Sequence, residues 1–83
     1  MTLPGQIRAA RALLGWSQSR LADEVGVSTM TIKRAEGSGK PPVPEETNQA
    51  LRTALESHGV VFISENGGGP GVRMASASKG SLT

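Results

Sequence analysis

Hydrophobic residues in the first 59 positions recur every three or four residues, which is the spacing of a single buried face on a helix. This pattern predicts four amphipathic helices, over residues 4–14, 18–24, 28–36 and 44–57. The side chains expected to face a common core are Ile7, Ala10, Leu14, Leu21, Ala22, Val25, Ile32, Ala35, Ala50, Leu51, Ala54 and Leu55.

Residues that start or stop helices lie at the predicted boundaries. Ser17 and Ser28 stand where a hydroxyl can accept a hydrogen bond from the first turn of a helix. Gly15 ends the first helix, and Gly26 supplies the positive φ that a tight turn between the second and third helices needs. Pro44 suits the start of the fourth helix, because its missing N–H would have no partner there.

The pattern changes after residue 59. Residues 60–63 (VVFI) and 72–74 (VRM) are short β-branched runs separated by a glycine-rich segment, so they predict a β-hairpin with a long loop. Residues 75–83 have no apolar pattern and are expected to form a disordered tail. The expected organisation is a helical unit over 1–59, a hairpin over 60–74 and a tail over 75–83.

Composition indicates one small domain. Its 83 residues contain only two aromatic side chains, Trp16 and Phe62, so the core must be mainly aliphatic. The lack of cysteine excludes disulfides and thiolate metal sites, which fits a reducing cytoplasm. No apolar run approaches the ~20 residues that span a bilayer, and the N-terminus lacks the apolar stretch of a signal peptide. We therefore expect a cytoplasmic protein without a membrane partner.

Positive charge is concentrated in the first half of the chain. Residues 1–40 carry a net charge of +3, whereas residues 41–83 carry −1. The excess lies in the part that contains the predicted second and third helices, and it fits a polyanionic partner.

No group of residues indicates catalysis. Serines, carboxylates and one histidine are present, but no spacing among them joins a nucleophile to a base. The glycine-rich run at 67–71 is not followed by the Gly-Lys-Ser/Thr of a phosphate-binding loop. His58 follows the fourth predicted helix, where a cation is favoured by the helix dipole. We expect a protein that is not an enzyme and needs neither a cofactor nor a metal.

Residues 15–36 (GWSQSRLADEVGVSTMTIKRAE) are the most informative segment. Together with their flanks, over roughly residues 4–57, they resemble the Cro/C1-type (XRE-like) helix-turn-helix regulators of bacteria and phages. The matching positions are Gln18, Leu21, Ala22, Val25, Gly26, Val27, Ser28, Ile32 and Glu36. The resemblance implies a mainly α, compact, lambda-repressor-like domain of four helices, followed here by a short C-terminal β-hairpin.

The resemblance also implies roles for individual residues. Residues 28–36 would be the recognition helix in the DNA major groove, with Thr29, Met30 and Arg34 contacting base edges. Arginine can bond guanine at two positions, whereas threonine and methionine can pack on a thymine methyl group. The residues expected to contact the DNA backbone are Gln18, Ser28, Thr31, Lys33, Arg20 and Lys40. The family often has amide side chains on this face, so their absence implies modest direct readout, supplemented by DNA shape.

Arg11 and Glu36 match positions that form an internal ion pair in some family members. The pair would tie the first helix to the end of the third. Its expected role is structural, not DNA-binding.

The hairpin raises the question of assembly. A two-stranded sheet is marginal in water, so its strands either fold back on the helices or pair with a second copy. Proteins of this type usually bind as two-fold dimers on half-sites ~34 Å apart. We expect a homodimer whose interface includes Val60, Val61, Phe62, Ile63, Val72 and Met74.

These observations predict a sequence-specific, double-stranded DNA-binding transcriptional regulator, a nucleoid-associated bacterial repressor that acts on a palindromic operator. The alternative is a helix-turn-helix protein-interaction module, an antitoxin or anti-activator that binds a protein partner. The small net charge and the few polar groups at the base-contacting positions favour the alternative, whereas Lys33 and Arg34 disfavour it. Salt dependence of duplex binding separates the two.

Overall fold

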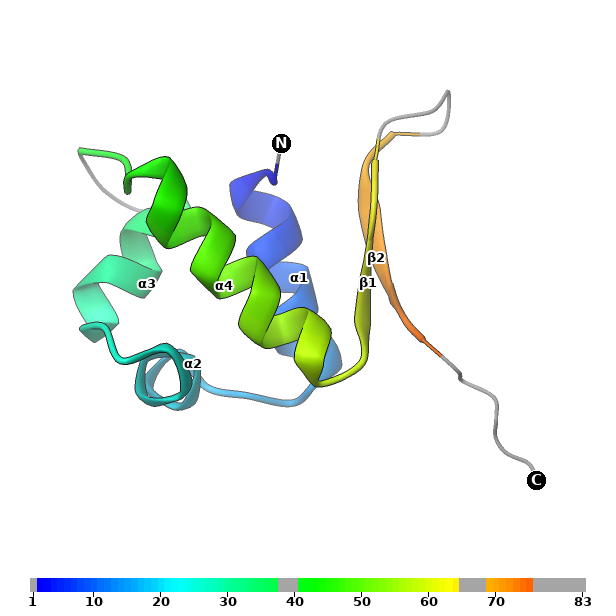
Figure 1. Cartoon of the computed structure of the whole chain (residues 1–83), viewed down its shortest axis with the longest axis horizontal. Coiled ribbons are helices and arrows are strands. Elements are labelled where there is room, and N and C mark those ends of the chain that lie inside the picture. The colour runs from blue at the N-terminus through cyan, green and yellow to red at the C-terminus, as the bar shows by residue number, and fades with distance from the viewer. Residues whose placement is uncertain (1, 38–40, 65–68, 76–83) are drawn as a thin grey trace.

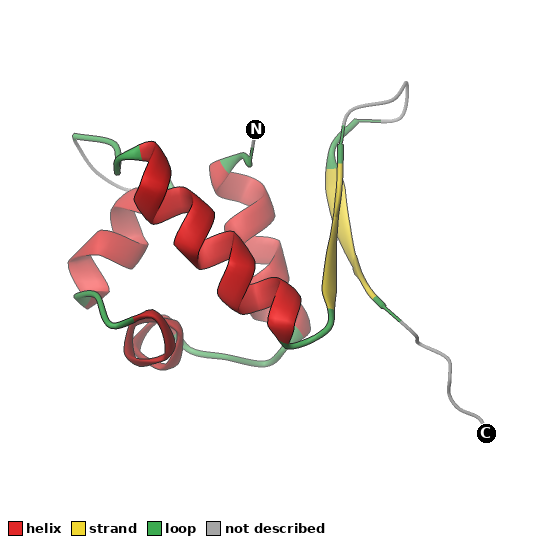
Figure 2. Ribbon diagram, in the orientation of Figure 1, coloured by secondary structure: helices red, strands yellow, loops and turns green. Residues whose placement is uncertain are grey.

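The computed structural model describes residues 2–37, 41–64 and 69–75. Its elements are helices α1 (Pro4–Leu13), α2 (Gln18–Val25), α3 (Thr29–Ala35) and α4 (Glu45–Ser57), followed by strands β1 (Val60–Ile63) and β2 (Gly71–Met74). This confirms the predicted mainly helical architecture with a C-terminal hairpin. α1 and α4 occupy the centre, with α2 and α3 to one side and the hairpin to the other (Figures 1 and 2).

Local hydrogen bonds explain why α2 and α3 begin and end where they do. The Ser17 hydroxyl accepts from the Arg20 N–H at 3.0 Å, and the Ser28 hydroxyl accepts from the Thr31 N–H at 3.1 Å. Gly26 closes α2 with a φ of 84°, a conformation that is strained for residues with a Cβ. These caps and the turn fix the angle between α2 and α3.

The core lies where all four helices meet. Ile7, Leu21, Ile32, Leu51 and Leu55 have no exposed surface, and each such side chain contributes about 1.5–3 kcal/mol of burial free energy. The remaining buried hydrophobic residues are Ala10, Ala22, Ala35, Val60 and Phe62.

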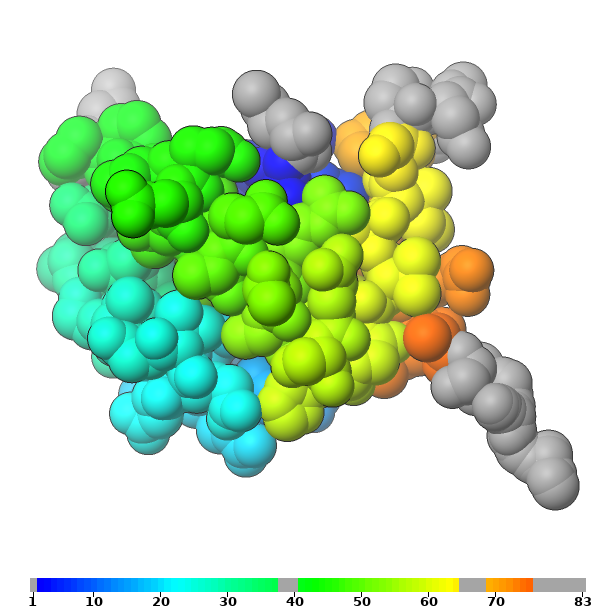
Figure 3. Space-filling view, viewed as in Figure 1, coloured from blue at the N-terminus to red at the C-terminus, as the bar shows by residue number. Residues whose placement is uncertain are grey.

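The expectation that Ala50 is buried is wrong, because its side chain is exposed. α4 turns Leu51 and Leu55 fully inward and half-buries Ala54, but α2 and α3 do not cover the adjacent side of the helix. Figure 3 shows α4 on the surface between α2 and β1.

The hairpin folds back on the helices. Val60 and Phe62 of β1 are buried in the helical core, and their partners in register, Met74 and Val72, are half-buried against it. The buried side chain of Gln6 in α1 secures the contact, because its Nε2 donates to the carbonyls of Ile63 at 3.1 Å and Gly71 at 3.0 Å. The hairpin is therefore part of the same packed unit as the helices.

Some of the predicted features concern residues that the structure does not describe. Lys40, the central part of the hairpin loop and all but Ala75 of the predicted tail lie outside the described residues. In the part of the chain that the structure does describe, no helix is both long and apolar enough to cross a membrane.

Candidate nucleic-acid interface

α3 has two faces of different character. Ile32, Ala35 and the C-cap residue Glu36 point into the molecule and are buried. On the opposite side, Met30 is 61% exposed, Lys33 is exposed and Arg34 is half-buried. These three positions are spaced by three and four residues, so they share one side of the helix. We call Met30, Lys33 and Arg34 the outer face of α3.

The N-terminal turn of α3 supplies polar groups beside this face. Thr29 and Thr31 are both half-buried. The hydroxyls of Ser28 and Thr31 lie 3.0 Å apart and hydrogen bond to each other, so two of the residues predicted to contact the DNA backbone form one polar cap. Their oxygens remain exposed to a ligand at the start of the helix.

Arg34 is only partly available. Its Nε is buried and has no hydrogen-bond partner among the described residues. The guanidinium still carries its positive charge and its two Nη donor groups. An arginine on this face is thus suited to a phosphate or to a guanine edge.

A buried network around Glu36 holds the end of α3 in place. The Glu36 side chain is 2% exposed, and its carboxylate accepts from Arg11 Nε at 2.7 Å and from Arg11 Nη2 at 3.2 Å. Arg11 Nη1 also donates to the carbonyl of Trp16 at 2.9 Å, and Arg8 Nη1 donates to the carbonyl of Glu36 at 3.3 Å. The Arg11–Glu36 ion pair implied by the resemblance is present, and it joins α1 to both the following loop and α3.

The Gln18 side chain lies in this network, which differs from its expected contact with DNA. Its Nε2 donates to Glu36 Oε1 at 3.1 Å. The side chain points inward because the first turn of α2 packs beside the end of α3. What Gln18 can still offer a phosphate is its backbone N–H, at the start of α2.

Arg20 also has partners within the domain. Its guanidinium lies 4.5 Å from the centre of the Trp16 ring, and its Nε is 3.4 Å from Glu24. Its side chain is 52% exposed, so this arrangement is screened by water and can open. The i, i+4 spacing of Arg20 and Glu24 is the signal in the sequence that could have indicated this ion pair.

His58 connects α2 to the end of α4. Its Nε2 donates to Glu24 at 3.1 Å, and its ring meets Trp16 edge-on at 4.6 Å. The hydrogen bond from His58, followed by that from Arg20, lowers the pKa of Glu24. His58 is the C-cap of α4, so the predicted position at a helix C-terminus is correct.

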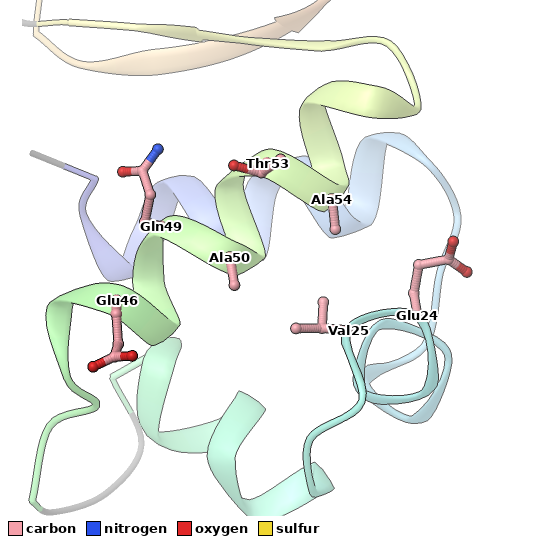
Figure 4. Close-up of a pocket in the computed structure, with 7 residues that line it drawn as sticks. All are labelled: Glu24, Val25, Glu46, Gln49, Ala50, Thr53 and Ala54. Carbon is pink, nitrogen blue, oxygen red and sulfur yellow. The ribbon is translucent and has the colours of Figure 1, made fainter.

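An apolar groove of about 600 Å³ lies between α2 and α4 (Figure 4). Val25, Ala50 and Ala54 contribute its apolar surface, and Glu24 and Glu46 contribute carboxylates. Negative charge there repels phosphate. A nucleic acid is therefore suited to the outer face of α3 and not to this groove.

Comparison of the sequence with known protein families agrees with this geometry. Residues 7–42 match the family model described as helix-turn-helix. No curated protein matches the chain. The match spans α1, α2 and α3, and this segment belongs to the Cro/C1-type helix-turn-helix family. Residues 7–42 thus form a helix-turn-helix domain of a family of DNA-binding regulators.

Proposed function

We propose that the protein is a sequence-specific repressor that binds a palindromic operator as a homodimer, with α3 in the major groove of each half-site. The observation that carries the proposal is the outer face of α3, where an exposed Met30 stands beside Lys33 and Arg34. A groove-binding helix needs an unobstructed side that combines groups for bases with positive charge for phosphates.

Within this proposal the side chains have separate tasks. Thr29 and Met30 pack against thymine methyl groups, and Arg34 bonds a guanine edge. Ser28, Thr31 and Lys33 contact the DNA backbone. Arg20, whose side chain is exposed, and Lys40 add charge. Gln18 contributes through its backbone N–H, since its side-chain amide is bonded to Glu36.

Selection of bound duplexes from a random pool, followed by titration against salt, tests sequence-specific binding. Lys33→Ala should weaken binding to all duplexes about equally and reduce the salt slope by about 1. Arg34→Ala should instead relax the preference at one position per half-site, at a cost of about 1–3 kcal/mol. A chain that selects no sequence and binds duplex without salt dependence would contradict the proposal and favour a protein-binding role.

The outward side of the hairpin is the proposed dimer contact. Val61 and Ile63 alternate with the buried Val60 and Phe62, so they lie on the opposite side of β1, half-buried, with the exposed Arg73 opposite Val61 in register. Apolar side chains on an otherwise uncovered face of a two-stranded sheet, with free strand edges, favour pairing with a second copy. The inward side of the hairpin holds the strands in place for this contact, because it packs against the helices through Val60, Phe62, Val72 and Met74.

A charge on the outward face tests this interface. Val61→Lys should convert the dimer to a monomer in sedimentation experiments and weaken operator binding in parallel. Thr53→Lys adds the same charge at an exposed position of α4 and should leave the dimer intact. A Val61→Lys chain that sediments as a dimer would refute the proposed contact. Truncation after Gly59 would not test the dimer contact cleanly. It also removes Val60 and Phe62 from the core, so it would destabilise the monomer.

A further inference from the structure

The sulfur atoms of this protein are all thioethers, since the chain has three methionines and no cysteine. The two described methionines differ in their surroundings. Met74 is half-buried and packs against the core, whereas Met30 is 61% exposed. Among the described residues, an oxidant in solution therefore reaches the sulfur of Met30 most easily.

We propose that Met30 is an oxidation site at which peroxide switches off DNA binding. The inference rests on the proposed function, in which Met30 packs against bases. In the reaction, a sulfur lone pair attacks one oxygen of hydrogen peroxide, an S–O bond forms and the O–O bond breaks. The departing hydroxide takes the proton from the new S–OH group and leaves as water. Sulfur loses two electrons, and the product is methionine sulfoxide.

The sulfoxide opposes DNA binding in two ways. It replaces an apolar thioether by a polar group, which is poorly matched to a thymine methyl. It also places a strong acceptor oxygen within one turn of Lys33 and Arg34, whose side chains are neighbours of Met30 on the same side of α3. A hydrogen bond from either cation to the sulfoxide withdraws a positive group from the DNA.

The same geometry makes oxidation and DNA binding mutually exclusive. A helix seated in the major groove has its outer face covered by base edges, so bound DNA shields Met30 from peroxide. Saturating duplex should slow the oxidation of Met30 and leave that of Met74 unchanged. Because methionine sulfoxide is reduced enzymatically, loss of binding by this route is reversible.

The experiment treats the full chain with hydrogen peroxide, measures the oxidation of each methionine by peptide mass spectrometry, and titrates the selected duplex. Oxidation of Met30 should weaken binding about tenfold, the effect of one lost base contact, and methionine sulfoxide reductase should restore it. Met30→Leu removes the oxidisable sulfur, so its own affinity, measured before and after treatment, should be insensitive to peroxide. Met74→Leu is the matched control and should remain sensitive.

The outcomes separate the two claims. An untreated chain that selects no duplex would contradict the proposed function. Two results would overturn the oxidation switch alone. In one, wild-type protein keeps its DNA affinity after complete oxidation of Met30. In the other, peroxide lowers the DNA affinity of Met30→Leu as much as that of the wild type.

Discussion

Replacing Arg11 by methionine tests the idea that the buried ion pair stabilises the fold and has no direct part in DNA binding. The change removes both hydrogen bonds to Glu36 and the one to the Trp16 carbonyl. Among the described side chains, Glu36, which is 2% exposed, would then keep the amide of Gln18 as its one partner. Stranding a buried charge in this way costs about 3–5 kcal/mol.

That loss is large for a domain of this size. At the usual free energy per residue, 83 residues are stable by about 4–12 kcal/mol, so Arg11→Met should lose a quarter or more of the free energy of unfolding. From the low end of this range, the variant would be largely unfolded at room temperature. Urea titration followed by circular dichroism and by the fluorescence of Trp16 gives the free energy of unfolding. Any loss of operator affinity should match the fraction unfolded.

Two companion variants sharpen the experiment. Arg20→Met removes an arginine whose side chain is 52% exposed, so it should cost much less. Adding Glu36→Leu to Arg11→Met removes the stranded charge, so the double variant should be less destabilised than the sum of the single changes, by about 0.5–3 kcal/mol. A well-folded Arg11→Met protein that had lost DNA affinity would refute the structural role.

Three further changes probe other parts of the fold. Gln6→Leu should lower the free energy of unfolding by about 1–3 kcal/mol and speed amide exchange in β1, because the carbonyls of Ile63 and Gly71 lose their donor. Gln49→Leu, at an exposed position, is its control. Unchanged amide exchange would argue against a stabilising role of the two Gln6 hydrogen bonds. Gly26→Ala should cost about 1–2 kcal/mol in urea titrations because its φ is 84°, whereas Gly5→Ala, in a helix with open space, should not destabilise. His58 holds the pKa of Glu24 below its ordinary 4.5, so ionised Glu24 stabilises the fold above that value, and the stabilisation is lost as pH falls through the lower folded-state pKa. Urea midpoints of Glu24→Gln should depend less on pH over this range, and an identical dependence would refute the link.

The parts of the fold that local sequence determines were predictable. Capping by Ser17 and Ser28 and the turn at Gly26 depend on residues within one helical turn, so short-range rules identify them. The β-branched and aromatic run at residues 60–63 likewise predicted a strand. It could not show which side of β1 meets the helices, since both Val60 and Val61 are apolar.

The partners of polar side chains were less predictable, because they come from distant positions. Gln18 and Arg20 were both expected to contact the DNA backbone, yet Gln18 bonds Glu36 and Arg20 lies over Trp16. Gln6 was missed for the same reason, although its acceptance of a hydrogen bond from the Leu3 N–H is a local capping contact. Ala50 was misplaced because periodicity identifies an apolar stripe but not whether a neighbouring helix covers all of it.

The division of α3 into two faces explains how so short a helix serves both stability and recognition. Its inward residues include Ile32, without exposed surface, and Glu36, bonded to Arg11, so the helix axis is fixed by the core. Its outer face therefore projects in a defined direction without contributing to that core. Substitutions of Lys33 should change affinity and leave the unfolding free energy nearly unchanged, whereas substitutions of Ile32 should do the reverse. Because the outer face carries few hydrogen-bonding groups, each proposed half-site would add little discrimination. In the proposed dimer, selectivity would then depend on two such helices held at a fixed spacing.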